Sequence, residues 1–203
     1  TSGMTLHLAS PVALMVGIVT FRTDVKLLHA ALDSLEKSRI SAHVTLVDNS
    51  PEPSYTEQLR AEFSSRASVI RSPRNGGYGF GHNIALRETA ALQAPYHLIL
   101  NPDVVVEEHC LEILIEALEK ESDIALAMPL ILNPDGSIQH LNKNDPTVMD
   151  LAIRRFVPHR LQVLPLLARR MAHYVRMREG YDSRSEIPYA SGCFMLFRRS
   201  VLD

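Results

Sequence analysis

Residues 96–106, Tyr-His-Leu-Ile-Leu-Asn-Pro-Asp-Val-Val-Val, indicate what kind of sheet this chain forms. The first five are mostly apolar, as in a strand buried on both faces, and Asn101-Pro102-Asp103 ends the run. A carboxylate then follows a central strand, at the edge where open α/β sheets bind ligands. Because Pro102 stiffens the backbone on both sides of it, Asp103 is the first candidate for a metal or phosphate site. An ordinary strand-ending turn is the alternative, since all three residue types are common in turns.

The neighbouring sequence alternates short apolar runs with helical patterns. Strands are expected at 11–20, 44–47, 68–71, 96–100 and 124–128, and helices at 24–38, 55–63, 84–93 and 106–121. Asp24 is placed to cap the first of these helices. A last strand is expected near 193–197, followed by a turn or helix at Arg198. This alternation predicts an α/β fold with a Rossmann-like, mostly parallel sheet and helices on both faces.

The composition is that of an ordinary soluble globular protein. The chain has 203 residues, of which 46% are hydrophobic and 22% charged, and its formal net charge of -2 gives no reason to expect nucleic acid as a partner. No apolar run approaches the roughly 20 residues that span a bilayer. The two cysteines, Cys110 and Cys193, form no metal-binding pair, which favours a reducing cytoplasm.

The segment 151–178 has a different character, because it contains arginines interleaved with apolar residues and no acidic residue. Such a basic amphipathic segment suits an anionic membrane surface or an anionic acceptor. The alternative is a pair of solvated helices packed on the sheet.

A glycine-rich stretch, 74–83, follows the third expected strand. It matches neither the dinucleotide fingerprint nor a Walker motif, because His82 stands where the last glycine of the fingerprint is needed. Its glycines still allow backbone N–H groups to approach a ligand closely, and the helix that follows directs its N-terminus towards an anion. A flexible connection is the alternative.

Three polar loops are expected at the same edge of the sheet. Asp48 follows the second strand, 74–83 follows the third, and Asn101-Pro102-Asp103 follows the fourth. Together they offer a carboxylate for a base N–H, amides for hydroxyls and a carboxylate for a divalent ion. This arrangement predicts a nucleotide diphosphate ligand.

Five motifs, spread over nearly the whole chain, carry a family resemblance. They are Val19-Thr20-Phe21-Arg22, Val47-Asp48-Asn49-Ser50, the stretch 75–83, Leu98-Ile99-Leu100-Asn101-Pro102-Asp103 and Ser191-Gly192-Cys193-Phe194-Met195-Leu196. In these motifs the chain resembles the family 2 glycosyltransferases, and within them the rhamnosyltransferase-like enzymes of bacterial cell-surface polysaccharide synthesis, which build O-antigen, lipopolysaccharide and cell-wall glycans. The resemblance implies the A-type glycosyltransferase fold, with a nucleotide-sugar bound across the carboxyl ends of the strands.

Position by position, the resemblance gives Thr20 and Asp48 to the nucleoside, 75–83 to the nucleotide-sugar, and 101–103 to the place of the Asp-x-Asp motif. Asp103 would bind Mg²⁺ or Mn²⁺ bridging the diphosphate. Asn101 departs from the aspartate of the general motif, and one charge fewer should weaken the metal. The full expected substrate-binding set is Thr20, Phe21, Asp48, Asn75, Gly76, Gly77, Gly81, Asn83, Asn101, Asp103, Ser191 and Gly192.

The resemblance further implies an inverting hexosyltransferase that moves a sugar, with dTDP-rhamnose as one donor, to a saccharide or a polyprenyl-linked saccharide. We expect a cytoplasmic enzyme, peripheral at the inner membrane face, with a single domain made of a donor half (11–132) and an acceptor-side half (133–203). The family's carboxylate base is expected beyond Asp203, so the chain is expected to be a C-terminally truncated fragment that binds donor but transfers poorly. A non-catalytic nucleotide-sugar-binding module is the alternative. A sugar-phosphate nucleotidyltransferase is disfavoured, since 20–24 lacks the glycine-rich loop that such an enzyme needs.

Overall fold

The computed structural model describes residues 12–139, 157, 185–186 and 190–202. The chain divides into two compact units, Thr1–Met128 with Gly192–Asp203, and Pro129–Ser191. In the second unit the described residues include a tight turn, where Leu132 bridges Ile138 and Gly136 has a φ of 82°. Apart from Val157, the basic segment 151–178 lies outside the described residues.

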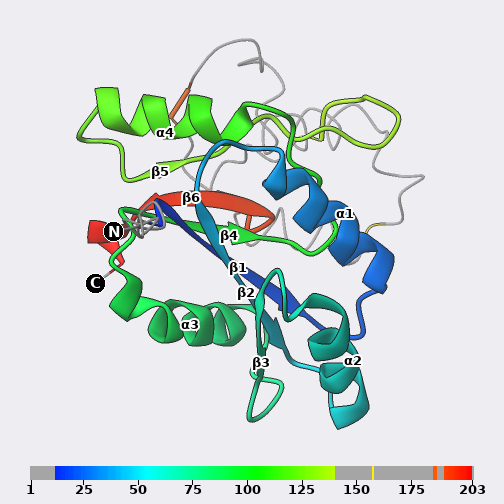
Figure 1. The fold of residues 1–203 in the computed structure, drawn as a ribbon. Helices are drawn as coiled ribbons and strands as arrows, with labels where there is room; N and C mark the ends of the chain where they lie inside the picture. Colours follow the sequence, from blue (N-terminus) through cyan, green and yellow to red (C-terminus); the bar gives the residue numbers. More distant parts are fainter. Residues whose placement is uncertain (1–11, 140–156, 158–184, 187–189, 203) are drawn as a thin grey trace, which may run out of the picture. The chain divides into compact units, whose positions relative to one another are not determined.

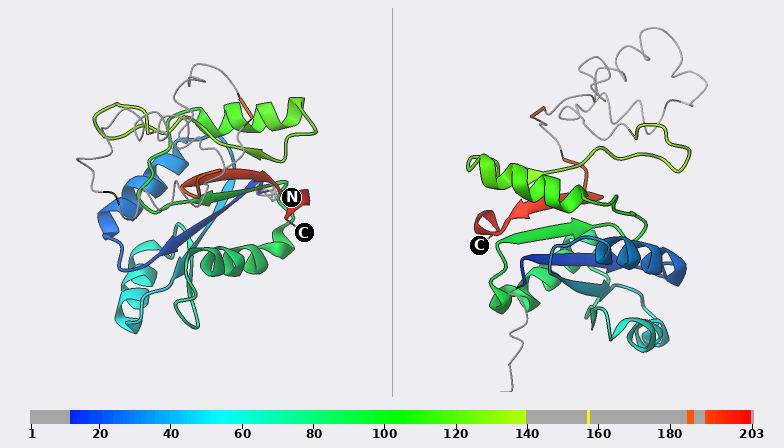
Figure 2. Two further views of the ribbon diagram at one scale, coloured as in Figure 1. Left: turned by 180° about the vertical axis from the view of Figure 1, so that it is seen from behind. Right: turned by 45° about the horizontal axis from the view of Figure 1, so that its top comes forward.

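The first unit is built on a six-stranded sheet in the order β3-β2-β1-β4-β6-β5 (Figure 1). The strands β1 to β4 are parallel, and β6 runs antiparallel between β4 and β5 (Figure 2). The mostly parallel sheet expected from the sequence is therefore confirmed. The strands are β1 (Leu14–Thr20), β2 (Ala42–Asp48), β3 (Ser68–Arg71), β4 (Tyr96–Leu100), β5 (Leu126–Ala127) and β6 (Phe194–Arg198).

Helices cover both faces of this sheet. They are α1 (Val25–Glu36), α2 (Pro53–Phe63), α3 (Tyr78–Glu88) and α4 (Cys110–Lys120), with short 3₁₀ helices η1 (Ala90–Leu92) and η3 (Arg199–Val201). Asp24 caps α1 as expected, because its carboxylate accepts the backbone N–H of Lys26 at 2.9 Å.

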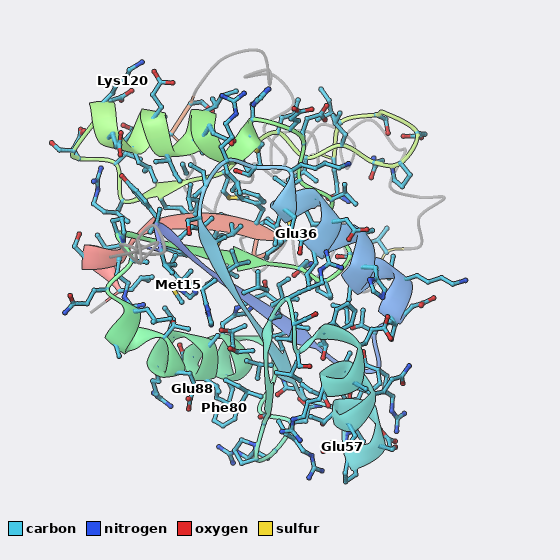
Figure 3. All side chains as sticks on the ribbon, viewed as in Figure 1. Met15, Glu36, Glu57, Phe80, Glu88 and Lys120 are labelled. Atoms are coloured by element: carbon cyan, nitrogen blue, oxygen red, sulfur yellow. The ribbon has the colours of Figure 1, made fainter. Side chains whose placement is uncertain are left out.

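Hydrogen bonds between helices show which of them share a face. His29 of α1 pairs with Glu62 of α2 at 2.7 Å, and Ser38, just after α1, donates to Glu112 of α4 at 2.9 Å. The helix α3 lies on the opposite face (Figure 1). The side chain of Met15 lies between β1 and α3 (Figure 3).

Two helices begin elsewhere than the sequence pattern predicts. The helix α3 begins at Tyr78 instead of Ile84, so half of the glycine-rich stretch is helical. Its glycines weaken the helical pattern, but Gly81 lets the helix approach β1 closely: a Cβ on it would lie 2.7 Å from the Val19 side chain. The helix α4 begins at Cys110 instead of Val106, because the backbone N–H of Val106 donates to Ser34 at 2.9 Å.

The centre of the core holds an unusual polar cluster over Gly17 of β1. A Cβ on Gly17 would lie 3.2 Å from His82 Nδ1 and 3.5 Å from His97 Nε2, so the glycine gives the two imidazoles room. Both side chains are buried. Within the described part of the chain, neither ring has a hydrogen-bond partner, and the hydroxyl of Thr45 has none either. Burial lowers the pKa of each imidazole to about 4, and the charges of Arg199 and His82 act in the same direction on His97.

None of the helices among the described residues is long and apolar enough to cross a membrane.

Candidate functional site

The polar loops gather at the carboxyl edge of the sheet. The register pairs Thr20 at the end of β1 with Asp48 at the end of β2, and Leu100 at the end of β4 with Phe194 at the start of β6. Because the first four strands are parallel, their following loops share this edge. The convergence expected from the sequence is confirmed for these loops.

Asp48 is the anchor of the loop after β2. Its side chain is fully buried, and Oδ1 accepts the N–H of Ser50 at 2.8 Å and the hydroxyl of Thr20 at 3.5 Å. Its Oδ2 accepts the hydroxyl of Thr56 at 2.5 Å. The pKa of nearby Tyr55 is raised by burial and by the charge of Asp48. Both carboxylate oxygens are thus occupied, so a nucleoside contact by Asp48 requires an exchange of hydrogen bonds.

The loop after β1 presents an aromatic ring to solvent. Phe21 is 50% exposed, and the guanidinium of Arg22 lies 5.6 Å from its ring centroid. Arg22 has a φ of 50°, a strained value for a residue other than glycine, and its N–H donates to Ser50 at 2.8 Å. Its guanidinium pairs with Glu52, and this hydrogen bond lowers the pKa of the Glu52 carboxyl. The loop therefore offers a fixed, exposed aromatic face.

The glycine-rich stretch turns sharply into α3 at Gly77, whose φ is 85°. The N–H of Gly77 donates to the Asn75 side chain at 3.1 Å, and its carbonyl accepts Asn49 Nδ2 at 3.0 Å. The start of α3 is thereby tied to the end of β2. Free N–H groups in the first turn of a helix suit an anionic ligand.

Asp103 is exposed beyond the end of β4. The N–H of Asn101 donates to the carbonyl of Cys193 at 2.8 Å, which fixes this loop against the start of β6. From α3, the hydroxyl of Tyr78 donates to the carbonyl of Gly192. Burial raises the pKa of the Tyr78 hydroxyl most, and Cys193 and Asp103 raise it further, so the hydroxyl stays protonated.

Asp103 is the one residue expected to hold a divalent ion. Among the described residues no group of three or more His, Cys, Asp or Glu side chains could hold a metal. An exposed single carboxylate still fits Mg²⁺ or Mn²⁺, because such ions take one or two protein carboxylates and complete their shell with substrate phosphates and water.

The structure links six of the twelve expected site residues in three pairs. Thr20 lies with Asp48, Asn75 with Gly77, and Asn101 with Gly192 through its neighbour Cys193. Gly76 is exposed before α3, Gly81 is buried against β1, and Asn83 is exposed on α3. Ser191 belongs to the second unit, where it is partly exposed.

Four residues that organise this edge are absent from the expected substrate-binding set: Asn49, Ser50, Thr56 and Tyr78. Three of them stand inside stretches already singled out, beside Asp48 and within the glycine-rich segment. Thr56 carries no sequence signal, since its role appears only when α2 folds back onto β2.

The mostly parallel sheet and the polar loops at its carboxyl edge define an α/β protein with a ligand site at that edge. Residues 15–203 match the family described as Glycosyl transferase family 2, and the chain therefore belongs to this family of glycosyltransferases. No match was found among the curated proteins.

The chain is similar in fold to the mannosyltransferase PcManGT from Pyrobaculum calidifontis, whose structure was solved in complex with GDP-Man and Mn²⁺. The identity is 14% and the TM-score 0.56, over 94% of this chain and 45% of that one. This chain thus spans less than half the length of the solved protein. The A-type glycosyltransferase fold is confirmed by this likeness. A second structure, S. aureus TarS 1-349 in complex with UDP-GlcNAc, is similar over 64% of this chain and 38% of that one, at 20% identity and a TM-score of 0.48.

Proposed function

We propose that this chain carries the donor site of an inverting, nucleotide-sugar-dependent glycosyltransferase. The observation that carries the proposal is the carboxyl edge of the sheet. There the ring of Phe21 and the carboxylate of Asp103 are exposed, and hydrogen bonds from Asn49 and to Gly192 hold the start of α3. These groups suit, in turn, a base, the counter-ion of a diphosphate and the diphosphate itself.

Each part has a defined task in this proposal. Phe21 stacks on the base, and Asp48 holds the surrounding loop through Thr20, Ser50 and Thr56. The first turn of α3 faces the diphosphate. Asp103 holds Mg²⁺ or Mn²⁺, which when bound neutralises charge on the leaving nucleoside diphosphate.

Two donors and one class of acceptor suit this site. dTDP-rhamnose is the first donor to test, because the motifs resemble the rhamnosyltransferase-like branch. GDP-mannose is the second, since the similar PcManGT binds GDP-Man. A saccharide or polyprenyl-linked saccharide is the proposed acceptor, with the protein at the inner membrane face. Failure to bind anionic liposomes at low salt would argue against that location.

Calorimetric titration tests the donor site directly. The protein is titrated with UDP, dTDP and GDP, each with and without Mn²⁺, and compared with Asp103→Ala and with Asp123→Ala. Asp123 is also an exposed carboxylate, and it precedes β5 at the opposite edge of the sheet. We expect metal-dependent binding of one nucleotide, weakened about tenfold or more in Asp103→Ala only. Binding that is equal in all three proteins, or absent from all, would refute the proposal.

The alternative is a module that binds the donor without transferring the sugar. A transfer assay with the nucleotide-sugar that binds best separates the two, because a binding module releases no nucleoside diphosphate in the presence of an acceptor.

A further inference from the structure

Tyr78 is the first residue of α3, and its side chain reaches Gly192, which follows it by more than a hundred positions. Its hydroxyl donates to the carbonyl of Gly192. A Cβ on Gly192 would lie 3.3 Å from Cε1 of the ring, so the phenol lies directly against this glycine. On another side the ring meets His82 edge-on, with centroids 4.3 Å apart. The ring is therefore held in one place although it is 38% exposed.

Gly192 leads into the strand that borders the proposed metal site. The next residue, Cys193, accepts the backbone N–H of Asn101 at 2.8 Å, and Phe194 pairs with Leu100. A group attached to Gly192 is thus attached to the backbone that presents Asp103.

The start of α3 is held from the other side as well. Asn49, after β2, donates to the carbonyl of Gly77, the residue before Tyr78. The chain of contacts runs from β2 through the start of α3 to β6 and β4. Of these contacts, the Tyr78 hydroxyl bond is the one that joins α3 to the β4–β6 side of the site.

We propose that Tyr78 is a positioning residue for the donor diphosphate. By holding Gly192, it fixes the separation between the first turn of α3 and the carboxylate of Asp103. The diphosphate and its ion must fit between these two groups, because one offers N–H donors and the other holds the cation. The inference rests on the proposed donor site and deepens it, since it names what sets the width of its diphosphate part.

Tyr78→Phe tests the inference, because it removes the hydroxyl and keeps the ring. Tyr96→Phe is the matched control, since Tyr96 lies at the opposite end of β4. Each protein is titrated with UDP, dTDP and GDP in the presence of Mn²⁺, and with uridine, thymidine and guanosine. The comparison uses the nucleoside diphosphate that wild type binds and the nucleoside with the same base. We expect Tyr78→Phe to raise the Kd for the diphosphate about fivefold to tenfold, which is the loss typical of one hydrogen bond. The nucleoside Kd should stay within about twofold, because Phe21 and the β2 loop are untouched. Tyr96→Phe should change neither.

Gly192→Ala gives an independent route to the same result. Its methyl group displaces the ring of Tyr78, so this variant should bind the nucleoside diphosphate more weakly and bind the nucleoside as wild type does. The variant with both substitutions should bind the diphosphate almost as well as the more affected single variant, because both substitutions disrupt the same contact between Tyr78 and Gly192.

The outcomes separate the two proposals. If wild type binds the diphosphate and Tyr78→Phe binds it equally well, the inference is wrong and the donor site stands. Equal weakening of nucleoside and diphosphate would show a general loss of structure and also overturn it. If wild type binds no nucleotide, the donor site itself is wrong, and the inference falls with it.

Discussion

Replacing His97 by leucine should make the fold less sensitive to acid. His97 and His82 are both buried over Gly17, and the described residues offer their ring nitrogens no hydrogen-bond partner. Burial lowers the pKa of each to about 4 from the ordinary 6.5. Each imidazole is therefore neutral in the folded protein at a pH where it is protonated in the unfolded chain.

This difference in pKa between the folded and the unfolded state determines how the free energy of unfolding changes with pH. Above pH 6.5 neither state carries the extra proton, so stability is full. Between pH 6.5 and 4 the unfolded chain takes up protons that the folded protein refuses, and stability falls. Each buried imidazole lowers the free energy of unfolding by about 3 kcal/mol once the pH is below both its folded and its unfolded pKa. Between pH 7 and pH 5 the loss is about 2 kcal/mol.

Urea unfolding at several pH values measures this contribution. Between pH 7 and 5, wild type should lose about 2 kcal/mol more of its unfolding free energy than His97→Leu does. At pH 8 the variant should be close to wild type, because it removes two unpartnered nitrogens along with the ring. His109→Gln, at an exposed histidine before α4, is the control and should leave the pH dependence as it is.

The comparison has a clear failing result. If the difference in unfolding free energy between wild type and His97→Leu is the same at pH 7 and at pH 5, the imidazole is not held neutral in the folded protein. The buried cluster must then be hydrated well enough to accept a charge.

Three further predictions test the packing of the first unit by urea unfolding. Gly81→Ala should destabilise by about 1–3 kcal/mol, because its methyl group meets a valine of β1, whereas Gly79→Ala on the open side of the same helix should stabilise by about 0.5–1 kcal/mol. Equal effects would contradict the close approach of α3 to the sheet. Thr56→Val should cost about 1–3 kcal/mol by leaving a buried oxygen of Asp48 without its donor, and an unchanged midpoint would show that the contact is dispensable. Arg198→Leu should cost about 1–2 kcal/mol, because its guanidinium caps carbonyls at and beyond the end of α4; hydrogen exchange in α4 no faster than in wild type would count against that.

The fold was largely predictable from local patterns. Apolar runs predicted β1, β2 and β4 to within a few residues, because most residues of these strands are buried. The edge strand β3 has no buried residue, yet its predicted bounds also match. The gathering of Asp48 and Asp103 at one edge followed from parallel strands alone. The start of α3 could not be read, because glycine hides a helix whose stability comes from tertiary contact with Val19.

The position of the candidate site in the fold was predictable, but the hydrogen bonds that join its loops were not. The burial of Asp48 depends on Thr56, and the bond from Tyr78 to Gly192 joins residues that no spacing relates. Such contacts are decided by how elements pack, so a one-dimensional pattern carries no trace of them. The pair of buried imidazoles was not predicted for the same reason. His82 lies on α3 and His97 on β4, and the space for both rings is left by Gly17 of β1.

The placement of β6 between β4 and β5 has a consequence for the order in which the chain folds. The four parallel strands can assemble once Leu100 has left the ribosome, because all their connections lie within residues 14–100. The last two strands must wait: β5 joins the sheet only through β6, and β6 pairs Arg198 with Tyr96 and Phe194 with Leu100. Closing so long a loop is slow, so the exposed flank of β4 has to stay unpaired while the intervening residues are synthesised. An unpaired strand edge of this kind is prone to aggregate, and a chaperone would be expected to bind there.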